Sequence, residues 1–324
     1  MTNYEILGVG SPIIDHIIHV NDAFLQTIPG KKGGMETVDF DTLQDLIKSS
    51  KQTLLTTTGG SCSNTMKGLA HLGFKTALLG VIGNDPASQC YLNAIKKFGV
   101  QPLFQISPQK TSQVVCMVTP EGERTCRAFL GASLDIQVDK ITPDLFQGVK
   151  LVHIEGYSLL QGSLTEHVME LAKKAYITIS FDLASFELVE QFQERILNLL
   201  SKYVDIAFAN EREILSLTGM TGKKGCEYLK DLSNIAIIKH GSKGCFVGKD
   251  SFLHYQPVIN VPVVDSTGAG DLFASGFLGA YLKGKPLDEC AIMGNLIGAA
   301  TVEIEGTDLP PQKWEELKKS LEMS

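Results

Sequence analysis

Residues 265–284 read DSTGAGDLFASGFLGAYLKG, in which a turn of small residues precedes a helix-like apolar pattern. The pattern has the spacing of one helical face, with members Leu272, Phe273, Gly276, Phe277, Ala280 and Tyr281. At the preceding turn, Gly268, Ala269 and Gly270 let backbone N–H groups converge without side-chain obstruction. Together with the positive end of the helix dipole, these groups predict an anion site.

Asp271 follows this turn directly and has two interpretations. An acidic residue in a first helical turn often only complements the dipole, as a cap. Beside an anion site, the same carboxylate can act as a general base that takes a proton from an attacking hydroxyl. Phosphoryl transfer to an alcohol accounts for the anion site and the carboxylate together.

The rest of the chain predicts an α/β fold, because β-branched apolar runs alternate with helix-length segments. The predicted strands of the main sheet are 5–10, 76–83, 150–156, 177–183, 204–210 and 235–241. The predicted helices are 62–73, 163–175, 186–203, 268–284, 286–304 and 311–322. We find no repeat and no long linker, so residues 1–324 are predicted to form one folding unit.

Two regions interrupt the alternation and predict a small second sheet, a lid packed over the main one. The first, at about 13–40, contains IIDHIIHV and METVDF. The second, at about 100–131, contains a hairpin whose turn is Pro120-Glu121-Gly122. Since a small sheet exposes its edges, pairing of lid strands in a homodimer is a further hypothesis.

Composition excludes several classes of protein. The chain has 44% hydrophobic and 20% charged residues and no long apolar run, which excludes disorder and predicts no membrane span. A net charge of −7 without basic runs argues against nucleic acid as a partner. The start lacks a signal-peptide pattern, and the seven cysteines are scattered, so we expect a cytoplasmic protein with reduced thiols.

Three motifs together resemble the ribokinase-like (PfkB) family of carbohydrate and nucleoside kinases. DSTGAGD is similar to the family's carboxyl-terminal signature, and GGSCSNTMKGLAHLG at 59–73 resembles the second signature in its adenosine-kinase-like form. Asn210 to Glu213 fits the family's NxxE motif. The resemblance spans nearly the whole chain and implies a three-layer α/β/α main domain with a β-sheet lid.

The resemblance also implies the roles of the motif residues. It makes Asp271 the catalytic base and places the anion hole for the γ-phosphate of ATP at Gly268, Ala269 and Gly270. Asn210 and Glu213 would organise Mg²⁺ and its waters, which suits a hard ion that retains water. The alternative for this pair is a capping box at a helix start.

On the acceptor side, the family's sugar-binding positions match Asp15, Gly59, Gly60 and Asn64. Glycines allow close backbone approach, and an amide both donates and accepts hydrogen bonds. Taken singly, Asp15 or Asn64 would more often be a turn residue.

Two further residues are assigned by resemblance to adenosine-kinase-like members or by ring chemistry. Arg124, in the hairpin segment GERT, would reach the transferred phosphate when the lid closes; an exposed arginine that only aids solubility is the alternative. Tyr157 would stack on a purine, with core packing as the alternative.

Nucleotide and cation positions complete the expected site. Lys239 stands where the family has threonine in a T-x-G segment, while Gly241 is kept. Asn295 matches an adenine-side position. Asp265 and Thr267 resemble ligands of a monovalent cation such as K⁺, and simple hydrogen bonding within the loop is the alternative.

Other nucleotide-binding classes fit poorly. Gly-x-Gly at 8–10 is followed by Ile13 and a strand-like run, so the dinucleotide fingerprint fails, and no GxxxxGK[ST] motif occurs. His16 and His19 would lie on opposite faces of a strand, which is unsuitable for binding one metal ion.

The sequence therefore predicts ATP- and Mg²⁺-dependent phosphorylation of a primary hydroxyl of a sugar or nucleoside. Adenosine is favoured by the motif form, although Ser11 stands where adenosine kinases often have asparagine. The alternatives are a furanose kinase of the ribokinase or fructokinase type, an inosine or guanosine kinase, and a non-catalytic binding protein of the same fold.

Overall fold

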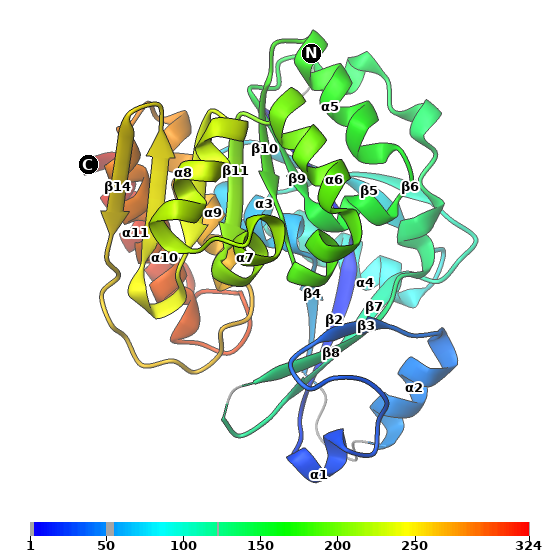
Figure 1. Cartoon of the computed structure of the whole chain (residues 1–324). Helices are drawn as coiled ribbons and strands as arrows, with labels where there is room; N and C mark the ends of the chain where they lie inside the picture. The colour runs from blue at the N-terminus through cyan, green and yellow to red at the C-terminus, as the bar shows by residue number, and fades with distance from the viewer. Residues whose placement is uncertain (1–2, 50–54, 122, 324) are drawn as a thin grey trace.

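The computed structural model describes residues 3–49, 55–121 and 123–323, and it contains two β-sheets of unequal size (Figure 1). Within these residues the large sheet has nine strands. Their spatial order is β14 (Phe252–Gln256), β13 (Cys245–Lys249), β12 (Ile235–Lys239), β11 (Ile206–Asn210), β10 (Thr178–Asp182), β9 (Leu151–Glu155), β1 (Ile6–Val9), β5 (Thr76–Ile82) and β6 (Gln101–Ile106).

The strands from β12 to β6 are parallel, and β13 and β14 continue the sheet antiparallel. All six strands predicted for the main sheet are present there. Buried apolar residues occupy successive positions in them, as in β5, where every residue of TALLGVI is buried. Such continuous apolar runs are typical of parallel strands that are covered on both faces.

Helices cover both faces of the large sheet and make three layers. Leu7 and Val9 of β1 pack into one core cluster, whereas Ile6 packs into the other. The first cluster contains residues of α5 (Leu164–Lys174), α6 (Phe186–Lys202), α7 (Glu211–Thr218) and α8 (Gly222–Leu232). The second contains residues of α3 (Ser61–His71), α4 (Pro86–Lys97), α9 (Ala269–Leu282), α10 (Leu287–Val302) and α11 (Pro311–Met323).

The small sheet is the lid that the sequence predicts, with a different set of strands. Its order is β3 (Met35–Thr37), β8 (Arg124–Phe129), β7 (Ser112–Val118), β2 (Ile13–His19) and β4 (Leu55–Gly59). Two corrections follow: β4 belongs to the lid although its polar sequence LTTTG gave no strand signal, and residues 101–106 form β6 of the large sheet. The expected hairpin connects β7 to β8, and Gly122 of its predicted turn lies outside the described residues.

The lid sheet has one face toward the large domain and one face covered by its own helices (Figure 1). On the covered face, Ile18, Val115 and Met117 pack with residues of α2 (Phe40–Ser49) and α1 (Asp22–Leu25). His16 is buried on this face, where its ring hydrogen-bonds Thr56 and Gln113. Among the described residues, every helix is too short or too polar to span a bilayer.

Candidate active site

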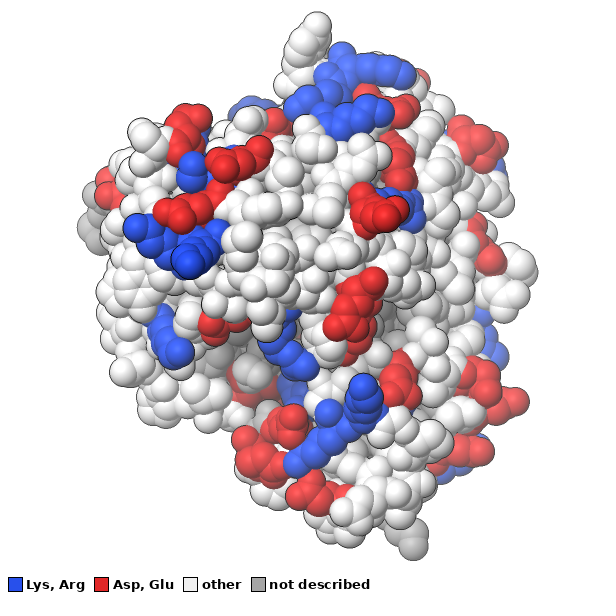
Figure 2. All heavy atoms as spheres, in the orientation of Figure 1, with Lys and Arg blue, Asp and Glu red and all other residues white. Residues whose placement is uncertain are grey.

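A cavity of about 600 Å³ lies between the lid and the carboxyl ends of the parallel strands. It is lined by residues of both sheets and by the amino end of α9, the helix that opens on the small-residue turn. In the space-filling view the surface is hollowed between the larger body and the lid, with acidic and basic side chains around the hollow (Figure 2). In open α/β sheets, this edge is where ligands bind.

Four neighbouring strands end at this cavity with polar side chains. Glu155 ends β9, Asp182 ends β10, Asn210 ends β11 and Lys239 ends β12. The register pairs Glu155 with Asp182, and Asn210 with Lys239. The four residues thus form a polar row along one edge of the sheet, and all four line the cavity.

The start of α9 has the geometry of an anion site. Gly268 precedes the helix with a left-handed φ of 67°, and a Cβ there would overlap the Thr307 side chain, so glycine is required. The first N–H of α9, that of Ala269, makes only a long 3.4 Å contact to the Ser266 carbonyl. Within the described residues, the N–H groups of Gly270 and Asp271 donate to no protein acceptor, so they are available to a bound anion.

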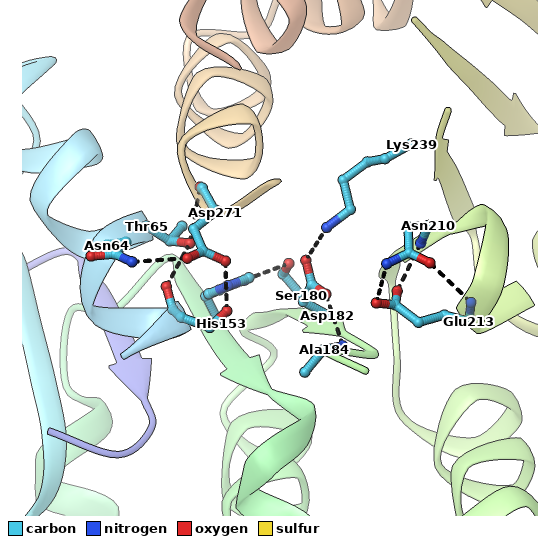
Figure 3. A network of polar contacts seen from close by, with 11 residues as sticks. Asn64, Thr65, His153, Ser180, Asp182, Ala184, Asn210, Glu213, Lys239 and Asp271 are labelled. Atoms are coloured by element: carbon cyan, nitrogen blue, oxygen red, sulfur yellow. Dashed lines mark hydrogen bonds and ion pairs between the residues drawn. The ribbon is translucent and has the colours of Figure 1, made fainter. Parts of the chain in front are cut away.

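Asp271 is buried at this helix start, and two side chains from α3 hold its carboxylate (Figure 3). The Ser61 hydroxyl donates to Oδ1 at 2.8 Å, and the Asn64 amide donates to Oδ2 at 2.9 Å. Burial raises the pKa of Asp271 above its ordinary value, and the two hydrogen bonds only partly counteract this effect. The carboxylate is therefore fixed in direction and more basic than an ordinary aspartate.

Removing the Ser61 hydroxyl should move the acid limb of the pH profile of kcat/KM to higher pH. The hydroxyl stabilises the ionised carboxylate, so Ser61→Ala should raise the pKa of Asp271 further. A general base works only when deprotonated, and activity is lost as pH falls through its pKa. The measurement is the rate of phosphoryl transfer across the acid range.

Thr65→Val is the matched control for this substitution. The Thr65 hydroxyl donates to the backbone oxygen of Asp271 at 3.1 Å and leaves the carboxylate untouched. The control should therefore keep the acid limb of the wild-type enzyme. If the acid limb of kcat/KM in Ser61→Ala stayed at the wild-type pH or moved to lower pH, it could not be assigned to Asp271.

Lys239 provides a buried cation next to the anion site. Its ammonium donates to Asp182 Oδ2 at 2.7 Å, and a Cβ built on Gly270 would lie 3.3 Å from Nζ. Burial lowers the pKa of Lys239, but Asp182 and Glu213 outweigh burial and leave this pKa above its ordinary value. The side chain thus stays positively charged beside the α9 amino end.

Asn210 and Glu213 form the capping box that the sequence allowed as an alternative. Asn210 Oδ1 accepts from the Glu213 N–H at 2.9 Å, and Glu213 Oε2 accepts from the Asn210 N–H at 2.7 Å (Figure 3). Both residues also line the cavity. Burial raises the pKa of Glu213, and the neighbouring carboxylates of Asp182 and Asp271 add to this effect. The capping geometry and a place in the site therefore coexist.

The acceptor residues predicted from the sequence lie together on the lid side of Asp271. Asn64 bridges Asp271 and Thr307, accepting from the Thr307 hydroxyl at 3.3 Å. Asp15, on β2, lies so close to Gly59 that a Cβ built on Gly59 would overlap the Asp15 carboxylate. Burial, followed by the negative charge of the nearby Cys116 thiolate, raises the pKa of Asp15 to about 7.

Gly60, Arg124 and Tyr157 also line the same cavity. Gly60 has a positive φ of 100°, and a Cβ on it would overlap the carbonyl oxygen of Ser11, so only glycine fits there. Arg124 begins β8, and its Nε donates to Cys116 Sγ at 3.3 Å. Tyr157 lies in a 3₁₀ turn, Gly156–Leu160, between the large domain and the lid.

Of the remaining predicted residues, Gly241, Thr267 and Asn295 line the cavity, and Asp265 lies in the loop before α9. The Asn295 amide donates to the carbonyls of Gln256 and Pro257 at 3.1 and 3.3 Å. Both oxygens of Asp265 accept hydrogen bonds within the loop, Oδ1 from the N–H and hydroxyl of Thr267 and Oδ2 from the Gly306 N–H. These contacts are the ones expected if Asp265 and Thr267 stabilise the loop by hydrogen bonds, which was the alternative to binding a cation.

Three residues of the site escaped the sequence analysis: Ser61, Glu155 and Asp182. Glu155 is fully buried and accepts from the N–H groups of Ser11 and Cys62, both at 2.7 Å, which fixes the start of α3. Glu155 and Asp182 each lie at the carboxyl end of a predicted strand, and that position was the available signal. Ser61 carried no such signal, because a serine at a helix start is common.

Comparison with known proteins agrees with this fold. The model of the pfkB family carbohydrate kinases matches residues 35–314. An adenosine kinase from Sinorhizobium meliloti superposes with a TM-score of 0.91 and 26% identity, covering 98% of this chain and all of that one. A fructokinase from Vibrio alginolyticus is 31% identical over 291 residues, 84% of this chain and 94% of its own. An adenosine kinase from Schizosaccharomyces pombe is 24% identical over 343 residues, 97% of this chain and 98% of its own.

The family match and the relatives identify a kinase that acts on an alcohol group. The chain belongs to the PfkB family of carbohydrate kinases. It is a phosphotransferase with an alcohol acceptor carried by a sugar or nucleoside, and PfkB kinases use ATP with Mg²⁺.

Proposed function

We propose that this chain is an ATP- and Mg²⁺-dependent nucleoside kinase that phosphorylates the primary hydroxyl of adenosine. The observation that carries the proposal is a small apolar extension of about 40 Å³, which shares Ile13, Met35, Val114 and Tyr157 with the main cavity. Its lining is shared by the lid and the large domain: Ser11, Ile13, Met35, Val114, Ala128, Leu130, Ser133, Leu134, Tyr157, Leu160 and Gln161. A free pentose has no apolar group to place against this extension, whereas a nucleoside in the main cavity can direct one edge of its base into it.

A polar feature of this extension favours a base with an amino group. Gln161 lines it, and its Nε2 donates to the Ser133 carbonyl at 2.8 Å. Gln161 Oε1 is buried and has no hydrogen-bond partner among the described residues. A buried acceptor without a partner is costly, and an exocyclic amine would satisfy it if the Gln161 side chain turned Oε1 toward the extension. Adenine carries such a donor at the position where hypoxanthine carries an oxygen.

The proposed chemistry uses the residues at the start of α9. Asp271 takes the proton from the acceptor hydroxyl, whose oxygen attacks the γ-phosphorus of ATP while the bond to the ADP oxygen breaks. The N–H groups of Gly270 and Asp271 and the ammonium of Lys239 stabilise the charge on the transferring group. Arg124 approaches the same charge from the lid.

The donor set at the sheet edge also suits a hydrated Mg²⁺ ion. The negative charge of Asp182 adds to burial in raising the pKa of Glu213 and of Asp271, so this edge of the sheet carries negative potential that a divalent cation would neutralise. Glu213 and Asn210 would hold the ion through water, and the bound ion would offset phosphate charge. We also propose that the loop of Asp265 and Thr267 binds K⁺, because both residues resemble the family's ligands of a monovalent cation.

A coupled assay with Mg-ATP and a panel of acceptors tests the proposal. The panel contains adenosine, inosine, guanosine, ribose and fructose, each with and without K⁺. We expect kcat/KM to be highest for adenosine, because the apolar extension binds the base and Gln161 accepts from its amino group.

The panel also separates the second candidate. The fructokinase relative makes a furanose sugar the main alternative acceptor. A higher kcat/KM for fructose or ribose than for every nucleoside would assign the chain to the sugar kinases. A preference for inosine or guanosine would keep the nucleoside class and overturn the assignment of Gln161 as an acceptor for the adenine amine.

A further inference from the structure

Two cysteines face each other across neighbouring strands of the lid. Cys116 of β7 is directly opposite Cys126 of β8 in the antiparallel register. The Cys126 N–H donates to the Gly34 carbonyl at 2.9 Å, on the side away from β7. The two cysteines are therefore a non-hydrogen-bonded pair, in which Cα atoms are about 4.5 Å apart and side chains approach most closely. A disulfide needs Cα atoms about 4.4–6.8 Å apart, so this pair can be bridged.

The pair lies on the lid face that covers the active site. Cys126 lines the same cavity as Asp15 and Arg124. Arg124 Nε donates to Cys116 Sγ at 3.3 Å, so the guanidinium lies against this sulfur. A hydrogen bond from the Cys126 thiol, together with the charge of Arg124, lowers the pKa of Cys116. The pair thus combines a nucleophilic sulfur with a resolving thiol.

We propose that Cys116 and Cys126 form an oxidisable dithiol, which a peroxide converts to a cross-strand disulfide, and that this modification slows phosphoryl transfer. The formation of the disulfide is inferred from the strand register and from the contacts of the two cysteines. Its effect on turnover rests on the proposed function, through Arg124.

The reaction balances in two steps. The Cys116 thiolate attacks one peroxide oxygen, and the O–O bond breaks. Hydroxide departs, and Cys116 becomes a sulfenic acid. The Cys126 thiol then displaces the hydroxyl, which leaves as water with the thiol proton, and the S–S bond forms. The two sulfurs lose two electrons in total, and the peroxide is reduced to the level of water.

The disulfide changes the surroundings of Arg124. A thiolate is a strong acceptor for the guanidinium, whereas a disulfide sulfur carries no charge. The arginine then loses the group that fixes its direction on the lid face, next to Asp15. Since small misplacements of catalytic groups cost up to about 100-fold in rate, we expect a fall of about tenfold or more in kcat/KM.

The test treats the full-length protein with hydrogen peroxide and follows two readouts. Peptide mass spectrometry should find the peptides of Cys116 and Cys126 joined, with the loss of two hydrogen atoms. The rate of ATP consumption with the best acceptor should fall and should recover on addition of dithiothreitol. Cys126→Ser should abolish both the joined peptides and the reversible loss of rate.

Cys90→Ser is the matched control, because Cys90 is exposed on α4 and outside the cavity lining. It should behave as the wild-type protein does. Each variant is judged by the ratio of its oxidised to its reduced rate, so a change of basal rate does not affect the result. If Cys126→Ser fails to fold, Cys116→Ser and binding of phenylarsine oxide, which bridges close thiols, give the same test.

Separate outcomes overturn separate parts. Absence of joined peptides, at peroxide levels that oxidise Cys90, would overturn the dithiol itself. Joined peptides with an unchanged rate would overturn its control of turnover. If no acceptor supports turnover, the proposed function fails, while the mass measurement still decides the disulfide.

Discussion

Replacement of Asp271 by asparagine is expected to lower kcat by about 10²- to 10⁴-fold, the share of a general base. The substitution preserves shape, and the amide can still accept from Asn64 and donate to Ser61. What it loses is the ability to take a proton from the acceptor hydroxyl. Steady-state rates with saturating adenosine and Mg-ATP measure the effect.

The same substitution should leave the folded state at least as stable at neutral pH. Because the native pKa of Asp271 is raised, the folded protein binds a proton more tightly than the unfolded chain does. Stability contributed by this group is present at low pH and is lost as pH rises from the ordinary aspartate range through the raised value. A neutral amide removes that loss, so thermal unfolding at neutral pH should not occur at a lower temperature.

Asp288→Asn is the matched control, since Asp288 is also an acid in the first turn of a buried helix, α10, but lies outside the cavity lining. If Asp271 were only a dipole-complementing cap, the two substitutions would have similar small effects on kcat and on stability. A kcat for Asp271→Asn within a few-fold of the wild-type value would refute its role as the base.

The parts of the site that were predictable from sequence are those encoded by short segments. The α9 start carries its own anion geometry, because the glycine at 268 and the helix that follows are adjacent in the chain. Asn210 and Glu213 are also local, and their capping box spans only four residues. In such segments the spacing of residue types specifies the geometry.

The parts that were missed depend on strand order, which a single sequence does not specify. Glu155 bonds Ser11, 144 positions away, only because β1 lies next to β9 in the sheet. Asp182 reaches Lys239 across β11 for the same reason. Likewise, β6 lies near the hairpin in sequence yet pairs with β5, so proximity along the chain wrongly assigned it to the lid.

Replacement of Lys239 by methionine should reduce both turnover and stability. The side chain keeps its length but loses the charge next to Gly270, so we expect kcat to fall by about 10²- to 10³-fold, as for one lost transition-state donor. It also leaves the carboxylate of Asp182, only 4% exposed, without its ion pair, which should cost about 3–5 kcal/mol in the free energy of unfolding. Urea denaturation and steady-state rates measure the two effects.

A second substitution separates the two roles of Lys239. Asp182→Asn in the Lys239→Met background removes the unpaired carboxylate, so most of the lost stability should return. Turnover should stay low, because the positive charge beside the anion site is still missing. If the double variant regained wild-type turnover together with its stability, Lys239 would be only the partner of Asp182. Another group in the site would then have to supply the positive charge that stabilises the transferring phosphate.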